Sequence, residues 1–179
     1  GGNIGTSFAS LVREDEKYEG YVIELSSFQL EGIVDFKPHI AILTNLSEDH
    51  LDRYDYEYKK YIEAKFRMIM NQTETDYFIY DAEDKEIKIW LDNNLTKSNL
   101  LPFSTIEKIE NGAYASEENI FVNISNKTFD MPIKQVKVQG KHNVKNAMAA
   151  STVAKLLQIR KDTIRESLKT FQGVEHRLE

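Results

Sequence analysis

The chain has 179 residues, with 23 basic against 29 acidic side chains and a formal net charge of −6 at pH 7. This length can bury a sizeable core in one domain. The acidic balance argues against a nucleic-acid-binding surface, which needs clustered basic residues. The sequence has no cysteine, which excludes disulfides and thiolate metal sites and suits a reducing cytoplasm. It has no apolar run of about 18 residues, so it encodes no membrane span.

A glycine-rich stretch opens the chain as Gly1-Gly2-Asn3-Ile4-Gly5, ahead of a helical run that starts at Ser7. Such a loop suits phosphate, but the P-loop pattern G-x-x-x-x-G-K-[ST] does not occur in the sequence. The chain also lacks an initiator methionine and a signal peptide. We therefore expect it to begin inside a longer protein.

A first strand is predicted at Tyr21-Val22-Ile23, which ends directly at Glu24. A carboxylate at the tip of an apolar strand is a common way to present an acid to Mg²⁺, a cation that takes oxygen ligands. Alternatively, Glu24 is a loop acid, and Ser26 and Gln29 form a capping box for the next helix. The spacing alone favours neither interpretation.

A second strand is predicted over Ile40–Leu43, which is apolar on both alternations, as in a parallel sheet covered on both faces. Polar residues 45–54 follow it. Ligands of open α/β sheets bind outside the carboxyl ends of the strands, so Asp49 and His50 are candidate site residues. The same pair could equally be a helix-capping acid beside a surface imidazole.

Apolar residues recur at steps of three and four within residues 55–71 and predict a helix with one apolar face. This face consists of Tyr58, Tyr61, Ile62, Phe66 and Ile69. Lys65 falls inside it, whereas Lys59, Lys60 and Arg67 are predicted to project away. Because lysine is rarely fully buried without a partner, Lys65 either extends its amine outward along its stem or meets an anion or a metal.

The second half of the chain predicts a strand over residues 77–80, then a turn and a polar helix from Glu83, with no catalytic group visible. Turn signals at Asn111-Gly112 and Asn126-Lys127 predict a small antiparallel sheet over residues 112–138. Its aromatic residues are predicted to pack against the protein rather than to stack on a ligand. These residues are Tyr114, Phe121 and Phe129.

A long helix is predicted to open at Gly140, with Asn143 and Asn146 on one side of its first turn. A carboxamide both donates and accepts hydrogen bonds, so it can contact an adenine edge, and helix N-termini favour anions. The residues alone favour the simpler interpretation that Asn143 caps the helix. A last helix is predicted from Asp162 to Phe171.

Several of these segments resemble the central ATPase domain of the Mur ligases and occur in the same order as in that family. The segments are Gly1-Gly2-Asn3-Ile4-Gly5, Glu24-Leu25-Ser26-Ser27-Phe28-Gln29-Leu30-Glu31, Thr44-Asn45, Glu48-Asp49-His50-Leu51-Asp52-Arg53-Tyr54, Ala64-Lys65, Gly140-Lys141-His142-Asn143, Asn146-Ala147 and His176-Arg177. Within the family, the run from Glu24 to Glu31 points to the member that adds D-glutamate, because its relatives carry other residues around the equivalent acid.

The resemblance implies a three-layer α/β fold, with a mainly parallel sheet flanked by helices and a small antiparallel extension. Residues 1–177 would form the central ATP-binding domain without its N-terminal P-loop segment. Residues 178–179 would begin the linker to a C-terminal domain that this chain does not include.

The resemblance also implies an ATP-dependent amide ligase of peptidoglycan precursor synthesis. Such an enzyme adds D-glutamate to UDP-N-acetylmuramoyl-L-alanine through an acyl phosphate. By resemblance, the catalytic and metal-binding residues are Glu24, His50 and a carbamylated Lys65, which would hold two Mg²⁺ ions. The residues facing the UDP-sugar would be Asn3, Ser26, Gln29 and His50. Those around ATP would be Asn143, Asn146 and Arg177.

Two other classes of function remain open. A metal-dependent phosphohydrolase could use Glu24, Asp49 and His50, and a non-catalytic module could bind a nucleotide sugar without turning it over. For the ligase we expect a cytoplasmic monomer that acts on small molecules and neither binds nucleic acid nor inserts into membranes. We expect the 179 residues alone to be inactive, because they lack the P-loop and the amine-binding domain.

Overall fold

The computed structural model describes residues 1–13 and 18–173, and the contacts within it divide the chain into two compact units. Unit 1 consists of Gly1–Lys37 and Glu48–Asn71. Unit 2 consists of Pro38–Ser47 and Gln72–Glu179. None of the helices in the described part of the chain is long and apolar enough to cross a membrane.

Unit 2 is built on a six-stranded sheet whose strands lie side by side in the order of the sequence. The strands are β1 (Ile40–Leu43), β2 (Tyr77–Asp81), β3 (Asn99–Ser104), β4 (Gly112–Ala115), β5 (Asn119–Ile124) and β6 (Lys127–Pro132). Strands β1 to β4 pair in parallel, whereas β5 and β6 pair antiparallel. The prediction of a mainly parallel sheet with a small antiparallel extension is confirmed.

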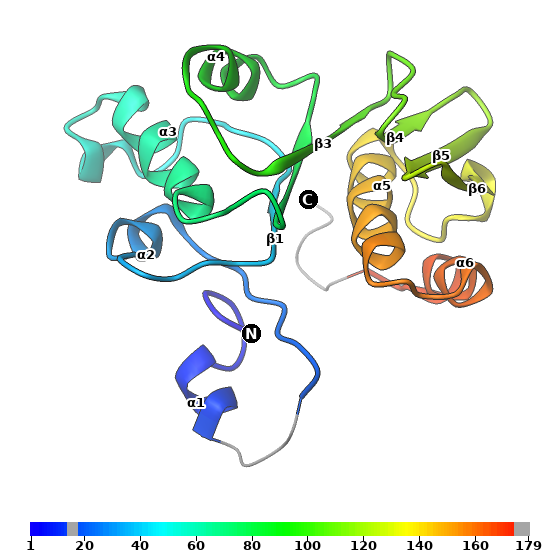
Figure 1. Ribbon diagram of the computed structural model, residues 1–179, viewed down its shortest axis with the longest axis horizontal. Helices are drawn as coiled ribbons and strands as arrows, with labels where there is room; N and C mark the ends of the chain where they lie inside the picture. Colours follow the sequence, from blue (N-terminus) through cyan, green and yellow to red (C-terminus); the bar gives the residue numbers. More distant parts are fainter. Residues whose placement is uncertain (14–17, 174–179) are drawn as a thin grey trace. The chain divides into compact units, whose positions relative to one another are not determined.

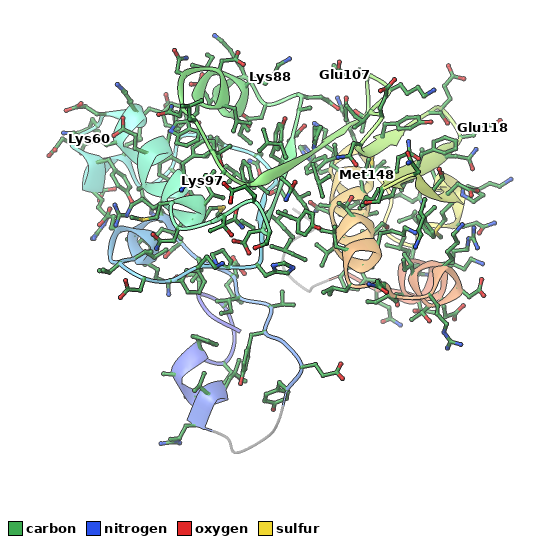
Figure 2. All side chains as sticks on the ribbon, viewed as in Figure 1. Lys60, Lys88, Lys97, Glu107, Glu118 and Met148 are labelled. Carbon is green, nitrogen blue, oxygen red and sulfur yellow. The ribbon has the colours of Figure 1, made fainter. Side chains whose placement is uncertain are left out.

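Three helices and one short 3-10 turn complete unit 2. They are α4 (Lys85–Asn93), η3 (Ile133–Gln135), α5 (Lys141–Leu156) and α6 (Lys161–Thr170). Figure 1 shows α5 alongside β4 and β5. This helix also contacts β2, β3 and α6. Its residue Met148, labelled in Figure 2, is fully buried in the core of this unit. Apolar side chains from β3 and β6, such as Phe103 and Phe129, complete that core.

Strand β1 forms as predicted, but its two faces are not equally covered. Ala41 and Leu43 are buried, whereas Ile42 is 38% exposed. The expectation of a strand covered on both faces is therefore wrong at Ile42. The difference follows from position, because β1 is the terminal strand of the sheet and α5 packs mainly against β4 and β5.

The antiparallel extension turns between β5 and β6 at Ser125 and Asn126. Both residues have positive φ angles, 49° and 62°, which suit a two-residue hairpin turn. The predicted hairpin is confirmed, with its turn one residue earlier than the Asn126-Lys127 signal. The three aromatic residues of the extension serve packing as predicted: Tyr114 stacks on Phe121 at 4.8 Å between ring centroids, and Phe129 is fully buried.

The second turn signal, Asn111-Gly112, does not mark a hairpin. Gly112 is the first residue of β4, which runs parallel to β3. Its φ angle is 145°, and a Cβ atom there would lie 2.2 Å from the carbonyl oxygen of Pro102. The glycine is thus needed for the close approach of two parallel strands rather than for a tight turn.

Unit 1 is helical. It contains α1 (Phe8–Arg13), α2 (Ser27–Glu31), η1 (Leu51–Tyr54), α3 (Tyr58–Phe66) and η2 (Arg67–Ile69), and α2 packs on α3. Arg67 donates from Nε to the carbonyl of Leu30 at 3.0 Å and from Nη2 to that of Ile33 at 2.6 Å. The expectation that Arg67 projects away is wrong, because the carbonyls at a helix C-terminus need donors and this arginine supplies them.

The segment Tyr21-Val22-Ile23 does not form the predicted buried strand. Val22 is 89% exposed, and the segment meets residues 1–3 through one isolated parallel bridge, Gly2 with Glu24, and one bond from the Gly1 amino group to the Val22 carbonyl at 3.1 Å. A strand needs a neighbour along its whole length to satisfy its backbone groups. Within the described residues this segment is therefore an extended loop, and Glu24 does not stand at the tip of a strand.

Candidate functional site

The glycine-rich loop of unit 1 is held against the backbone of Glu24. Glu24 donates its N–H to the carbonyl of Gly1 at 3.0 Å, and Asn3 donates its N–H to the carbonyl of Glu24 at 2.8 Å. Gly2, with φ at 110°, lies so close that a Cβ atom there would be 2.3 Å from the Glu24 carbonyl oxygen. The structure thus brings two of the predicted site residues, Asn3 and Glu24, next to each other.

Ser26 and Gln29 form the predicted capping pair at the start of α2. Ser26 is the N-cap residue, and both its N–H and its Oγ hydroxyl donate to Gln29 Oε1 at 2.9 Å. This pairing satisfies a backbone donor that the helix itself leaves unpaired. The capping interpretation is confirmed, and a role of these side chains toward substrate stays a prediction.

The loop before η1 holds His50 in the left-handed region, with φ at 50°. The N–H of His50 donates to Asp49 Oδ1 at 2.8 Å, and the imidazole Nε2 lies 3.5 Å from Asp49 Oδ2. The ring of Phe28, on α2, meets the imidazole edge-on at 5.9 Å between centroids. The interpretation of Asp49 as a helix-capping acid is wrong, because His50 is the N-cap residue of η1 and Asp49 accepts only from the N–H of that neighbouring residue.

Lys65 occupies the inner part of α3, as the periodicity predicts. Its Nζ lies 5.6 Å from the ring centroid of Tyr61, which is itself buried. Burial lowers the pKa of the Lys65 amine, while the negative charges of Asp49 and Glu24 act in the opposite direction. Lys65 is therefore partly buried with two carboxylates near enough to act on its charge, and a role toward an anion or a metal stays a prediction.

The neighbouring lysines of α3 are more exposed than Lys65. Lys60 points outward (Figure 2) and pairs with Asp55 at 2.8 Å and Glu57 at 2.7 Å. The Lys59 side chain is 86% exposed. Unit 1 thus gathers Glu24, Asp49 and Lys65 within electrostatic reach of one another. Among the described residues, no three His, Asp or Glu side chains are arranged as a metal site on their own.

The predicted nucleotide residues lie in unit 2, at the start of α5. Gly140 is the N-cap residue, and Asn143, three residues on, donates from Nδ2 to the carbonyl of Gln139 at 2.8 Å. The interpretation that Asn143 caps the helix is therefore wrong, because the cap position belongs to Gly140. Asn146 is exposed. Arg177, the third predicted nucleotide residue, lies outside the described residues.

One charged cluster was missed by the sequence reasoning. Asp81 at the end of β2 and Glu83 just after it both form ion pairs with Lys145 of α5. The available signal was the same one that drew attention to Glu24, namely an acid at the carboxyl end of an apolar strand. That signal does not identify the partner lysine, which lies about 60 residues further along the chain.

The family model of the Mur ligase middle domain matches residues 3–154. This chain belongs to that family. The match includes every predicted site residue except Arg177, and it spans segments of both structural units.

Proteins named UDP-N-acetylmuramoylalanine-D-glutamate ligase are similar to the whole chain. The one from Christiangramia forsetii is 63% identical over 179 residues, which are 100% of this chain and 40% of that protein. The one from Bacteroides fragilis is 46% identical over 178 residues, with 99% and 40% coverage. The chain thus spans about two fifths of the length of these relatives.

Solved structures of related ligases share the fold. UDP-N-acetylmuramate:L-alanyl-gamma-D-glutamyl-meso-diaminopimelate ligase from Neisseria meningitides superposes with a TM-score of 0.60 at 21% identity, over 77% of this chain and 41% of that one. MurF ligase from Thermotoga maritima, solved in complex with ADP, gives a TM-score of 0.53 at 16% identity, over 77% and 31%. The α/β fold class predicted from the sequence is confirmed.

We predict that Lys65→Met does not lower the stability of the protein and that it raises the urea midpoint of unfolding. Because burial holds the pKa of Lys65 below its unfolded value, the charged amine opposes folding at neutral pH. Methionine keeps the apolar stem against Tyr61 without that charge. The gain should shrink as the pH rises above the pKa of a free lysine, about 10.4.

The matched control is Lys59→Met on the exposed side of the same helix, which should stay within about 0.5 kcal/mol of wild type. A lower urea midpoint for Lys65→Met would mean that the attraction of Asp49 and Glu24 outweighs the cost of burial.

Proposed function

We propose that this chain is the middle, ATP-binding domain of a ligase that adds D-glutamate to UDP-N-acetylmuramoyl-L-alanine. The observation that carries the proposal is the 63% identity, over all 179 residues, to a protein named for that reaction. In our proposal residues 1–177 form the domain and residues 178–179 begin the linker to a C-terminal domain. The reaction is a cytoplasmic step of peptidoglycan precursor synthesis.

The proposed reaction proceeds in two steps. A carboxylate oxygen of the UDP-sugar substrate attacks the γ-phosphorus of ATP, which forms an acyl phosphate and releases ADP. The amine of D-glutamate then attacks the acyl carbon, and inorganic phosphate leaves as the amide forms. Both steps concentrate negative charge, so the site must offset charge and hold the reacting groups in line.

Unit 1 offers the donors for this task. Glu24 and Asp49 both act electrostatically on Lys65, and carboxylate oxygens are the ligands that Mg²⁺ prefers. In the proposal Glu24, His50 and a modified Lys65 would hold two Mg²⁺ ions, which would supply positive charge against that of the phosphates. The contact between Phe28 and His50 would fix the orientation of the imidazole. Asn3, Ser26, Gln29 and His50 would face the UDP-sugar.

Lys65 is proposed to act as a carbamate. Its lowered pKa favours the neutral amine, which is the form whose nitrogen attacks the carbon of CO₂. The ammonium first loses one proton to solvent, the neutral amine forms the new N–C bond as one C=O double bond of CO₂ becomes a single bond, and a second proton then leaves the nitrogen, so the cationic side chain becomes an anion with two oxygens. An unmodified ammonium would repel the two metal ions, whereas the carbamate adds oxygen donors to those of Glu24 and Asp49.

The proposed nucleotide contacts lie on α5. Asn143 and Asn146 are three residues apart and share one side of the first two turns of α5, where carboxamides can pair with base and ribose. The helix N-terminus beside them favours negative charge. Arg177 completes the proposed nucleotide set.

The full-length protein should release phosphate from ATP only when UDP-N-acetylmuramoyl-L-alanine and D-glutamate are both present, with one amide formed per phosphate. A coupled phosphate assay together with mass spectrometry of the product measures both. Replacing D-glutamate by L-glutamate is the control and should abolish turnover. Phosphate release at full rate without the amine would favour a phosphohydrolase, and binding without any turnover would favour the non-catalytic module.

Asn146→Ala and Asn143→Ala should each raise the KM for ATP about tenfold, the equivalent of one lost hydrogen bond of roughly 1.4 kcal/mol, with kcat little changed. Contacts made equally in the ground and transition states act as uniform binding. Steady-state kinetics with ATP varied measures the effect.

The matched control for Asn143 is Asn93 on α4, which also donates its amide to the carbonyl four residues before it. Asn93→Ala removes the same type of bond and should leave the KM for ATP unchanged. Unaltered ATP kinetics in both α5 variants would refute the assignment.

Lys65→Ala should abolish most ligase activity, a loss of about a hundredfold or more for a group that helps to offset charge in the transition state. Added formate or acetate should restore part of it, because a free carboxylate can supply the missing oxygens. Activity is measured across a concentration series of each acid. Lys59→Ala, on the exposed side of α3, should be fully active and insensitive to these acids. Full activity of Lys65→Ala would refute the carbamate.

A further inference from the structure

A buried ion-pair cluster in unit 2 joins the end of β2 to the first turns of α5. Lys145 Nζ lies 2.7 Å from Asp81 Oδ2 and 2.9 Å from Glu83 Oε2. The side chains of Lys145, Asp81 and Glu83 are only 13%, 6% and 10% exposed. Lys141, on the first turn of α5, adds a contact of 3.0 Å to Glu83 Oε2 from a more exposed position.

The other side of Glu83 is anchored to the chain that follows β3. Glu83 Oε1 accepts hydrogen bonds from the N–H of Thr105 at 2.5 Å and from its hydroxyl at 2.7 Å. One carboxylate therefore connects the ends of two neighbouring parallel strands to a helix. Two carboxylates facing two lysines leave the cluster neutral, which is the condition under which buried charges are tolerated.

The electrostatics agree with this geometry. Burial alone would raise the pKa of the Glu83 carboxyl, but the hydrogen bonds from Thr105, Lys145 and Lys141 outweigh it and lower the pKa from 4.5 to about 2. Burial also acts to lower the pKa of Lys145, yet its bonds to Asp81 and Glu83 leave that pKa raised. Glu83 and Lys145 therefore both stay ionised at neutral pH.

Lys145 connects the ion-pair cluster to the part of α5 that carries Asn146. Lys145 directly precedes Asn146 and is turned inward, whereas Asn146 is exposed. The start of α5 has no side-chain cap hydrogen bond, and its N-cap is a glycine. Glycine restrains the backbone weakly. The ion pairs therefore act together with the buried Val144 and Ala147 in placing the first two turns of α5 over the strand ends.

We propose that Asp81, Glu83 and Lys145 are positioning residues that orient Asn143 and Asn146 toward the nucleotide. This inference rests on the proposed function. The three side chains do not touch the nucleotide themselves. They fix the angle and depth at which α5 begins, and with it the two carboxamides.

The experiment compares Glu83→Gln with Asn146→Ala in the full-length protein, by steady-state kinetics with ATP and with D-glutamate varied. Glutamine can still accept from Thr105 but cannot pair with two lysines. We expect Glu83→Gln to raise the KM for ATP about tenfold, with kcat changed less than about threefold and the KM for D-glutamate unchanged. The matched controls are Glu107→Gln, at an exposed glutamate after β3, and Lys155→Met, further along α5. Both should behave as wild type.

Substitutions of Lys145 give a second test, which compares a variant that keeps the positive charge with one that removes it. Lys145→Arg keeps the cation and should stay within about threefold of the wild-type KM for ATP. Lys145→Met leaves two buried carboxylates without their partner and should raise the KM or prevent folding. Thermal unfolding of each variant identifies those that are folded at the assay temperature.

The outcomes separate this inference from the proposed function. If Asn146→Ala raises the KM for ATP and a folded Glu83→Gln protein does not, the positioning role is overturned and the nucleotide assignment stands. A Glu83→Gln protein with a lower melting temperature but unchanged ATP kinetics would likewise overturn the positioning role. If Asn146→Ala leaves ATP kinetics unchanged, the nucleotide assignment fails, and the positioning role fails with it.

Discussion

Parallel pairing of β1 to β4 is the constraint on which unit 2 depends. Parallel strands present all their carboxyl ends at one edge of the sheet, and each crossover returns the chain to the opposite edge. The register pairs Asp81 of β2 with Phe103 of β3, so the two strands end almost level. Polar groups that follow these ends are therefore brought together from distant parts of the sequence, and Glu83 meets Thr105 there. The start of α5 is joined to this edge by Lys145.

The sequence predicted correctly those elements that depend on residues close together in the chain. The strand at Ile40–Leu43 and the hairpin turn near Asn126 follow from apolar runs and from residues that tolerate positive φ. The failures lie where a distant partner decides. Tyr21-Val22-Ile23 is apolar enough for a strand but lacks a neighbour along its length, and Gly112 serves an approach to Pro102 that no spacing rule reveals.

The candidate site also contains features that nearby residues determine and features that distant partners determine. Lys65 could be placed on the inner face of α3 because helical periodicity fixes the direction of a side chain. The pairing of Lys145 with Asp81 could not be read from sequence, since it joins residues on different elements 64 positions apart. Lys65 also shows what a partly buried lysine costs, because burial lowers the pKa of its amine and so disfavours the charged form in the folded protein.

The pairing between β3 and β4 is short. Only two residue pairs join these strands, Phe103 with Ala113 and Ser104 with Tyr114, whereas β2 and β3 are joined by five. The β3–β4 pairing is therefore a narrow seam within the parallel part of the sheet, and α5, which contacts strands on both sides, packs across it. Amide hydrogens at this seam should exchange as one cooperative group whose opening requires α5 to lift from the sheet.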